Sequence, residues 1–194
     1  MGLESKPLKT TLRGRSLILR EANVADAAFI MSLRCDCQLS KFIHSTRSSV
    51  VEQEKWLSDY ALRPDDYYFI CEDAHGKPWG TVRIPSVQGH EFGVGSWVFL
   101  PDAPLGAAVQ AMLLAFRFGF DCLGCDLAVF DVRRGNEHVW RFHEACGARR
   151  TGEDADNFYY SLDKVAFLRT WSRYSSIVAC PDPSDWLQEV HRAE

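Results

Sequence analysis

Hydrophobic and polar positions follow two different periods along this chain of 194 residues, which indicates that strands and helices alternate. Apolar runs rich in β-branched and aromatic residues predict strands at 16–21, 67–72, 79–84, 126–132 and 158–162, and one more that ends at Leu100. Residues 149–153 are more polar, and we expect them to form a closing strand together with 158–162. Apolar residues at helical spacing predict helices at 24–35 and 51–62, a long one that ends near Phe120, one from Asn136, one at 165–175 and a short one at 185–192. No repeat interrupts this order, so we expect an α/β protein with one main domain.

Some boundaries carry their own local signals. Asn23 and Asp163 precede two of the helices and suit the N-cap position, because their short side chains accept hydrogen bonds from free amides. Gly93 and Gly95 fall inside the strand that ends at Leu100, and glycine within a strand indicates a bulge. We therefore expect one bent strand in this region.

The segment from Asn136 to Ala148 predicts a short helix with polar chemistry on one side. Two helical turns bring Asn136, His143 and Gly147 onto the same stripe. The side-chain oxygen of Asn136 can satisfy a free amide at the start, and Gly147 can adopt the positive φ that ends a helix. Taken alone, the pattern also fits an ordinary capped helix with one partly buried histidine.

The segment before it, Gly95 to Ala108, predicts a strand, a turn of small residues and the start of the long helix. Such a turn presents free backbone amides at the positive end of the helix dipole, where a phosphate or pyrophosphate can bind without a basic side chain. By itself, the Gly-x-Ala sequence from Gly106 to Ala108 is equally consistent with a plain strand-to-helix turn.

Composition narrows the class of protein. Charged residues make up 25% and hydrophobic residues 46%, as in ordinary globular domains, and the net charge of −4 argues against a nucleic-acid partner. The N-terminus lacks the apolar stretch of a signal peptide, and the seven cysteines indicate a reducing compartment, so a cytoplasmic location is expected. The pairs Cys35/Cys37 and Cys122/Cys125 have no matching ligand pair, so we expect no metal. We also expect no membrane span, because the long apolar helix contains Gln110 and Arg117.

The order of strand, phosphate-type turn, helix, strand and Asn-led helix resembles the GNAT superfamily of acyl-CoA-dependent N-acetyltransferases, over roughly residues 16 to 163. Several phrases are similar to a branch near the nucleotide-amino-sugar acetyltransferases of surface-glycan pathways: Gln53-x-x-Trp56-Leu57-x-x-Tyr60-x-x-Arg63, Tyr68-Phe69-Ile70, Gly80-Thr81-Val82-Arg83-Ile84, Gly95-Ser96-Trp97 and Phe130-Asp131-Val132-Arg133. The resemblance implies a GNAT-like mixed, mostly antiparallel, twisted sheet of about six or seven strands, splayed in the middle, with helices on both faces. It implies a GNAT-like domain at 1–163 and a C-terminal helical appendage at 164–194 packed on it.

The resemblance also implies acetyl-CoA as the cosubstrate and assigns residues to it. The pantetheine arm would pair with the backbone of the splayed strand, and an amide near Phe99 would stabilise the oxyanion. The residues implied for the cofactor are Val98, Phe99, Leu100, Gly106, Ala107, Ala108, Asn136 and Arg141. One departure is that Ala103 stands where the family usually has Gln or Arg, and the turn is one residue short.

The same resemblance assigns the chemistry. His143 stands where the family usually has Tyr, and it would protonate the departing sulfur. Glu91 would serve as the base, with His90 as the second choice. The acceptor cleft would be lined by Arg34, Arg83, Trp97 and Asp131, with Phe42 and His44 nearby, and the arginines suit a diphosphate unless they are held in salt bridges.

The acceptor stays open at this point. A nucleotide-linked amino sugar in surface polysaccharide biosynthesis, acetylated by direct attack in a ternary complex, is the favoured acceptor. A protein N-terminus or another small-molecule amine is the alternative, and a non-catalytic acyl-CoA-binding module is a third. The appendage could cover the active site, form a homodimer contact or simply pack on the surface.

Overall fold

The computed structural model describes residues 11–43 and 49–178. Ten strands form two five-stranded sheets. The first sheet has the order β1 (Thr11–Arg13), β2 (Ile18–Glu21), β3 (Tyr67–Glu72), β4 (Pro78–Ile84) and β7 (Gly95–Phe99). The second has the order β5 (Val87–Gln88), β6 (Glu91–Gly93), β8 (Leu127–Arg133), β10 (Asn157–Asp163) and β9 (Arg149–Glu153). Every pair is antiparallel except β6 with β8, so the predicted mixed and mostly antiparallel fold is confirmed.

The splay between the sheets lies where β6 gives way to β7. β6 pairs with β8 as far as Gly93 opposite Val129, and after Val94 the chain joins β4 of the other sheet. The expected single bent strand is therefore wrong in detail, because two strands in different sheets take its place. The backbone stays irregular there, since Ser96 has a φ of 48° and the β4–β7 register shifts.

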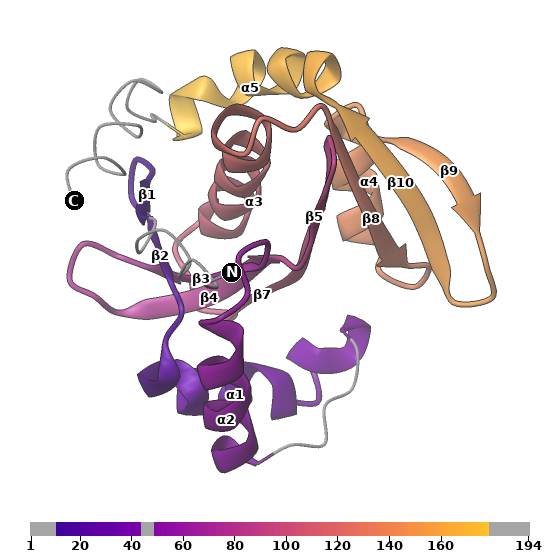
Figure 1. Cartoon of the computed structure of the whole chain (residues 1–194). Helices are drawn as coiled ribbons and strands as arrows, with labels where there is room; N and C mark the ends of the chain where they lie inside the picture. Colours follow the sequence, from indigo (N-terminus) through magenta and orange to yellow (C-terminus); the bar gives the residue numbers. More distant parts are fainter. Residues whose placement is uncertain (1–10, 44–48, 179–194) are drawn as a thin grey trace, which may run out of the picture.

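Helices cover both faces of the first sheet (Figure 1). On one face lie the 3-10 turn η1 (Val24–Asp26), α1 (Ala27–Cys35), η2 (Leu39–Phe42) and α2 (Val50–Tyr60). On the other face α3 (Ala107–Arg117) and the π-helical turn η3 (Phe118–Cys122) fill the angle between the two sheets. α4 (Glu137–Ala145) packs on β8, and α5 (Lys164–Val178) packs on α3 and β10.

The core explains the long apolar helix. α3 is buried on nearly every side, because residues of both sheets and of α5 surround it in one hydrophobic cluster. A smaller cluster joins α1 and α2 to β3 through Ile30, Leu57, Tyr60 and Ile70. Among the described residues, no helix combines the length and apolarity needed to cross a membrane.

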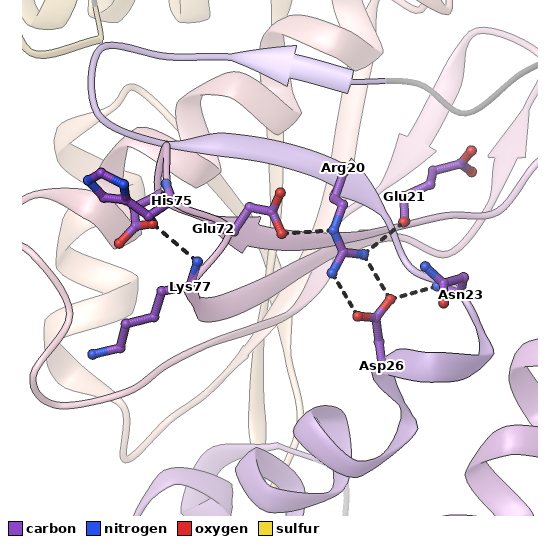
Figure 2. A network of polar contacts seen from close by, with 8 residues as sticks. Arg20, Glu21, Asn23, Asp26, Glu72, His75 and Lys77 are labelled. Atoms are coloured by element: carbon purple, nitrogen blue, oxygen red, sulfur yellow. Dashed lines mark hydrogen bonds and ion pairs between the residues drawn. The ribbon is translucent and has the colours of Figure 1, made fainter.

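A charged network fixes α1 on the first sheet (Figure 2). The guanidinium of Arg20 donates to Glu72 from Nε and to both carboxylate oxygens of Asp26, each at 2.8 Å. Asp26 also accepts from the backbone of Asn23, whose side chain caps the turn in a reciprocal capping box, so the predicted cap is confirmed. Hydrogen bonding to Asp26 raises the pKa of Arg20 above its usual value. The network therefore connects β2 and β3 to the start of α1.

The start of the predicted appendage is well packed. Asp163 caps α5 by accepting from the Ala166 amide at 2.8 Å, as predicted. Phe167 is fully buried against Phe116 and Phe120, and the Thr170 hydroxyl donates to Cys146 O at 2.6 Å. The predicted helix at 185–192 lies outside the described residues, and the boundary after residue 163 stays a prediction.

Candidate active site

A pocket of about 270 Å³, called the central pocket here, lies where β7 and β8 part. Side chains from both sheets, α1, η2, α3 and α4 form its walls. Six residues predicted for the site line it together: Arg34, Arg83, Trp97, Asp131, Asn136 and His143. Phe42 lines it as expected, whereas His44 lies outside the described residues. Residues nearly 110 positions apart in sequence therefore meet in one cavity.

A second pocket of about 340 Å³, called the side pocket here, opens between α2 and the first sheet. Its lining consists of Arg34, Glu52, Gln53, Trp56, Tyr68, Arg83 and Ser96. The two pockets share Arg34, Arg83 and Ser96, so they adjoin at these residues, and together they are called the cleft here.

His143 sits in an aromatic cage at the wall of the central pocket. The ring is 3% exposed, and its centroid lies 4.4 Å from that of Phe130, 5.3 Å from Phe142 and 5.8 Å from Trp97. Burial lowers the pKa of His143 to about 3, so the imidazole is neutral at neutral pH. Its Nδ1 atom is buried and has no hydrogen-bond partner among the described residues. A fully buried polar atom without a partner is unusual in a folded protein.

The helix that carries His143 begins and ends as predicted, but its cap differs. Asn136 precedes α4, yet its side chain makes no capping hydrogen bond, so this part of the prediction is wrong. Its backbone carbonyl accepts from Val139 and Trp140 at the first turn. The side chain lines the pocket instead, which suits the predicted contact with pantetheine. Gly147 has a φ of 90°, the left-handed conformation expected after the last turn.

β7 presents an open edge on the side of β8, since it is the last strand in the order of its sheet. The Leu100 amide donates to Trp79 O at 2.8 Å, toward β4. Peptide groups alternate in direction along a strand, so the Phe99 N–H points to the open edge, while those of Val98 and Leu100 point to β4. Gly80 permits this close pairing, because a Cβ there would lie 2.5 Å from the Phe99 ring. The geometry suits Phe99 as the backbone donor; the roles of Val98, Phe99 and Leu100 stay predictions.

The predicted phosphate turn leads directly into α3. Gly106 precedes the helix with a φ of 83°, a conformation that favours glycine, and Ala107 begins the helix. The Trp97 indole donates to Ala108 O at 2.9 Å and so ties β7 to the first turn of α3. The Ala107 amide donates to Pro104 O at 2.9 Å, so the predicted pyrophosphate contact would depend on the amides of Gly106 and Ala108.

The two cleft arginines differ in their surroundings. Arg83 makes a bidentate ion pair with the buried Asp66, at 2.7 Å from Nε, and its guanidinium lies 4.7 Å from the centre of the Trp56 ring. Arg34 is hydrogen-bonded to the hydroxyl of Tyr68, whose pKa is raised by burial. Arg83 is therefore held in a salt bridge, one of the two possibilities left open for it, and still lines both pockets.

Both candidate bases, Glu91 and His90, and the predicted cofactor residue Arg141 lie outside the central pocket and the side pocket. Glu91 is exposed at the start of β6, level with Leu127, which is four residues or about 13 Å along the strand from Asp131. Its neighbour His90 faces Asp126 at 3.6 Å. Arg141 is exposed on α4 and paired with Glu137. The parallel register of β6 and β8 places Glu91 at the closed end of the splay, and its role as base stays untested.

Sequence reasoning missed most of the side pocket. Glu52, Gln53, Trp56 and Tyr68 come from α2 and β3, and their spacing gave no sign of a shared cavity. Gln53, Trp56 and Tyr68 did belong to family phrases, which were the available signal. Within residues 11–43 and 49–178, no group of three or more His, Cys, Asp or Glu side chains is arranged to hold a metal ion.

Comparison with known proteins identifies the class. A family model for the acetyltransferase (GNAT) domain matches residues 16–149. FdhC, a nucleotide-linked sugar GNAT solved in its apo form, is 30% identical with a TM-score of 0.79, over 87% of this chain and 98% of that chain. A GCN5-related N-acetyltransferase from Brucella melitensis is 20% identical, with a TM-score of 0.71, over 88% of this chain and 86% of its own. Spermidine N-acetyltransferase from Vibrio cholerae, in complex with CoA and spermine, is 18% identical with a TM-score of 0.71, over 79% of this chain and 98% of its own. None of the curated proteins matches this sequence.

The chain belongs to the GNAT acetyltransferase family, as the resemblance implied. It is an N-acetyltransferase of the class that transfers an acyl group from acetyl-CoA to an amine. The splayed strands, the open edge of β7 and the turn before α3 are the features to which the family resemblance assigns the acyl carrier, and this assignment stays a prediction.

Proposed function

We propose that this enzyme transfers the acetyl group of acetyl-CoA to the amine of a nucleotide-linked amino sugar, by direct attack in a ternary complex. The supporting observation is the position of Arg34 and Arg83 in the lining of both pockets, where Arg83 is oriented by its ion pair with Asp66. A diphosphate suits such a surface, because guanidinium groups pair with phosphate oxygens. The likeness to a nucleotide-linked sugar GNAT at 30% identity supports the same acceptor class.

The shape of the cleft supports a ternary complex. The central pocket adjoins the β7 edge where the carrier would lie, and the side pocket extends away from it toward α2. The carrier and the acceptor can then approach the same point from two directions. In this arrangement the Phe99 amide would stabilise the oxyanion, and Gly106, Ala107 and Ala108 would hold the pyrophosphate.

His143 would then donate to the departing sulfur as a neutral imidazole. The N–H group of this neutral ring would stabilise the thiolate that develops on sulfur through a hydrogen bond, and the proton that ends on sulfur would come from the attacking nitrogen. Replacement of His143 by Phe should slow turnover while leaving acetyl-CoA affinity largely intact. An unchanged rate would remove His143 from the mechanism.

Part of the proposal concerns the cellular setting. We place the reaction in surface polysaccharide biosynthesis and in the cytoplasm. The six cysteines among the described residues are all free thiols, which suits a reducing compartment.

The first test is a thermal-shift titration with acetyl-CoA and with CoA, because a ligand that binds the folded state raises the melting temperature. Acetyl transfer is then measured on four amines: a nucleotide-linked amino sugar, the same sugar without the nucleotide, spermidine and a peptide N-terminus. We expect the highest kcat/KM for the nucleotide-linked sugar. A preference for spermidine or the peptide would replace the proposed acceptor, and tight binding without turnover on any amine would favour a non-catalytic module.

An arginine variant sharpens the test. Arg34→Gln should raise KM for the nucleotide-linked sugar more than for the free sugar, because only the former carries a diphosphate. The matched control is Arg169→Gln, at an exposed position on α5 outside the central and side pockets. Equal effects of Arg34→Gln on both sugars would contradict a role in diphosphate recognition.

A further inference from the structure

The central pocket contains one carboxylate among its described lining residues, that of Asp131 on β8. An amine acceptor arrives as an ammonium ion and must lose a proton before it can attack a carbonyl. The other charged side chains in this lining are Arg34, Arg83 and Arg133, which cannot accept a proton at ordinary pH. Asp131 is therefore the charged lining residue that can accept a proton, and its contacts show whether it is available to do so.

Asp131 and His143 reach the pocket from opposite faces of β8. Ala128, Phe130 and Val132 are buried on the face that meets α3 and α4, and the Phe130 ring is 4.4 Å from that of His143. Side chains alternate along a strand, so the exposed Asp131 lies on the other face. α1 and η2 contribute to the same pocket with Arg34 and Phe42. One face thus carries the imidazole and the other carries the carboxylate.

The carboxylate of Asp131 is available for a ligand. It makes no hydrogen bond or ion pair within the part of the chain that the structure describes, and its charge acts on Tyr159, its partner on β10. Arg133, two residues along on the same face, pairs with Asp156 at 3.5 Å. Arg34 of α1 and Arg83 of β4 line the facing wall.

The other acidic candidates are occupied or displaced. Glu52 accepts from the Ser49 amide at 2.6 Å as part of the capping box of α2. Asp66 is engaged by Arg83 in a bidentate pair. Glu91 is exposed at the closed end of the splay and does not line the cleft.

We propose that the Asp131 carboxylate binds the ammonium group of the acceptor and takes its proton. This proposal rests on the proposed function, that is, on acetyl transfer to an amine. One N–H proton passes to the carboxylate, and the nitrogen lone pair then forms the C–N bond with the thioester carbonyl. Collapse of the tetrahedral intermediate breaks the C–S bond, and the second nitrogen proton ends on the thiolate, giving the amide and CoA. The protonated Asp131 returns its proton to water.

The test compares kcat/KM across pH for the wild-type enzyme and Asp131→Asn, with whichever amine the wild type acetylates best. Without the carboxylate, the enzyme must wait for the fraction of acceptor that is already neutral in solution. The ratio of wild type to Asp131→Asn should therefore grow about tenfold for each pH unit below the pKa of the acceptor amine, and shrink as pH approaches that pKa. Asp131→Glu should restore part of the low-pH activity.

Two further variants keep the interpretation clear. Asp59→Asn removes an exposed carboxylate on α2 outside the cleft, and its pH profile should match the wild type. Glu91→Gln tests the base implied by the family resemblance. Thermal unfolding is used to check that each variant is folded. We expect Asp131→Asn to fold normally, because Asp131 is exposed and makes no hydrogen bond in the described structure.

The proposal is overturned if Asp131→Asn lowers kcat/KM by the same factor at every pH, because a group that only binds the acceptor would do so. It is also overturned if Glu91→Gln, and not Asp131→Asn, gives the pH-dependent loss. If the proposed acceptor class is wrong instead, the wild type will acetylate another amine in the panel. The same pH profiles measured on that amine would still decide the role of Asp131.

Discussion

The buried imidazole of His143 should make the stability of this protein depend on pH in a way that one substitution removes. The ring is 3% exposed within an aromatic cage, and burial lowers its pKa from the ordinary 6.5 to about 3. In the unfolded chain the same imidazole takes up a proton near its ordinary pKa. A group whose folded pKa is depressed contributes its full stability above the unfolded pKa and loses it as pH falls toward the folded pKa.

The size of this effect follows from the two pKa values. Each unit of difference corresponds to about 1.4 kcal/mol, so the free energy of unfolding should fall by about 2 kcal/mol between pH 8 and pH 5 through His143 alone. The loss would reach about 5 kcal/mol near pH 3. His143→Phe abolishes this contribution, because phenylalanine has no proton to gain and suits an aromatic cage.

The assay is urea unfolding of the wild type and His143→Phe at a series of pH values from 8 to 5, in the absence of ligands. The other titrating groups act alike in both proteins, so the difference between the two curves isolates His143. We expect the variant to gain about 2 kcal/mol relative to the wild type at pH 5. His138→Phe, at an exposed position of the same helix, should leave the wild-type curve unchanged. Parallel curves for the wild type and His143→Phe would refute the reasoning.

Three further changes test the framework of the site. Gly106→Val should weaken CoA binding in calorimetry, whereas Gly76→Val, with a similar φ of 78° at an open turn, should cost stability without that loss. Gly119→Ala should lower the free energy of unfolding by about 2 kcal/mol in urea, because the new Cβ would lie 2.3 Å from the Phe92 ring. Arg20→Met should cost about 2 kcal/mol in the same assay, because its charged hydrogen bonds to two carboxylates are lost.

The sequence predicted the elements whose signals are local. The helix caps at Asn23 and Asp163 form as expected, because a side chain and an amide within three residues decide them. The strands at 67–72 and 149–153 have the predicted bounds. Which positions of a strand or a helix are buried can likewise be predicted from the order of polar and apolar residues that are close together in the sequence.

The change of sheet at Val94, where the chain leaves the pairing of β6 with β8 and joins β4, could not be predicted from neighbouring residues. Glycines at 93 and 95 indicate a bend, but they do not say which partner each half of the strand chooses. That choice depends on distant packing, since the buried Phe92 of β6 lies against Gly119 of η3. The register set by this pairing decides where Glu91 lies. Glu91, which is close in sequence to residues of the site, therefore lies at the closed end of the splay.

The helix register predicted His143 and Asn136 more securely than strand reasoning predicted Glu91, because the spacing of a helix does not depend on pairing. The capping role of Asn136 failed, since its side chain lines the pocket instead. The side pocket could not be foreseen, because α2, β3 and β4 meet there only through tertiary packing.

The two faces of β8 carry different polar groups, so the two sides of the site differ in charge. On the face toward α4 the imidazole of His143 is kept neutral by its aromatic neighbours, and on the other face Asp131 and the arginines remain exposed to the cleft. In the proposed mechanism, Asp131 stabilises the ammonium ion on the cleft face, and the amine loses its proton there before it attacks the thioester. The N–H group of His143 on the neutral face would act only once negative charge has developed on sulfur. The attack by the amine and the departure of the thiolate would then depend on two side chains twelve positions apart in sequence, the exposed Asp131 and the buried His143.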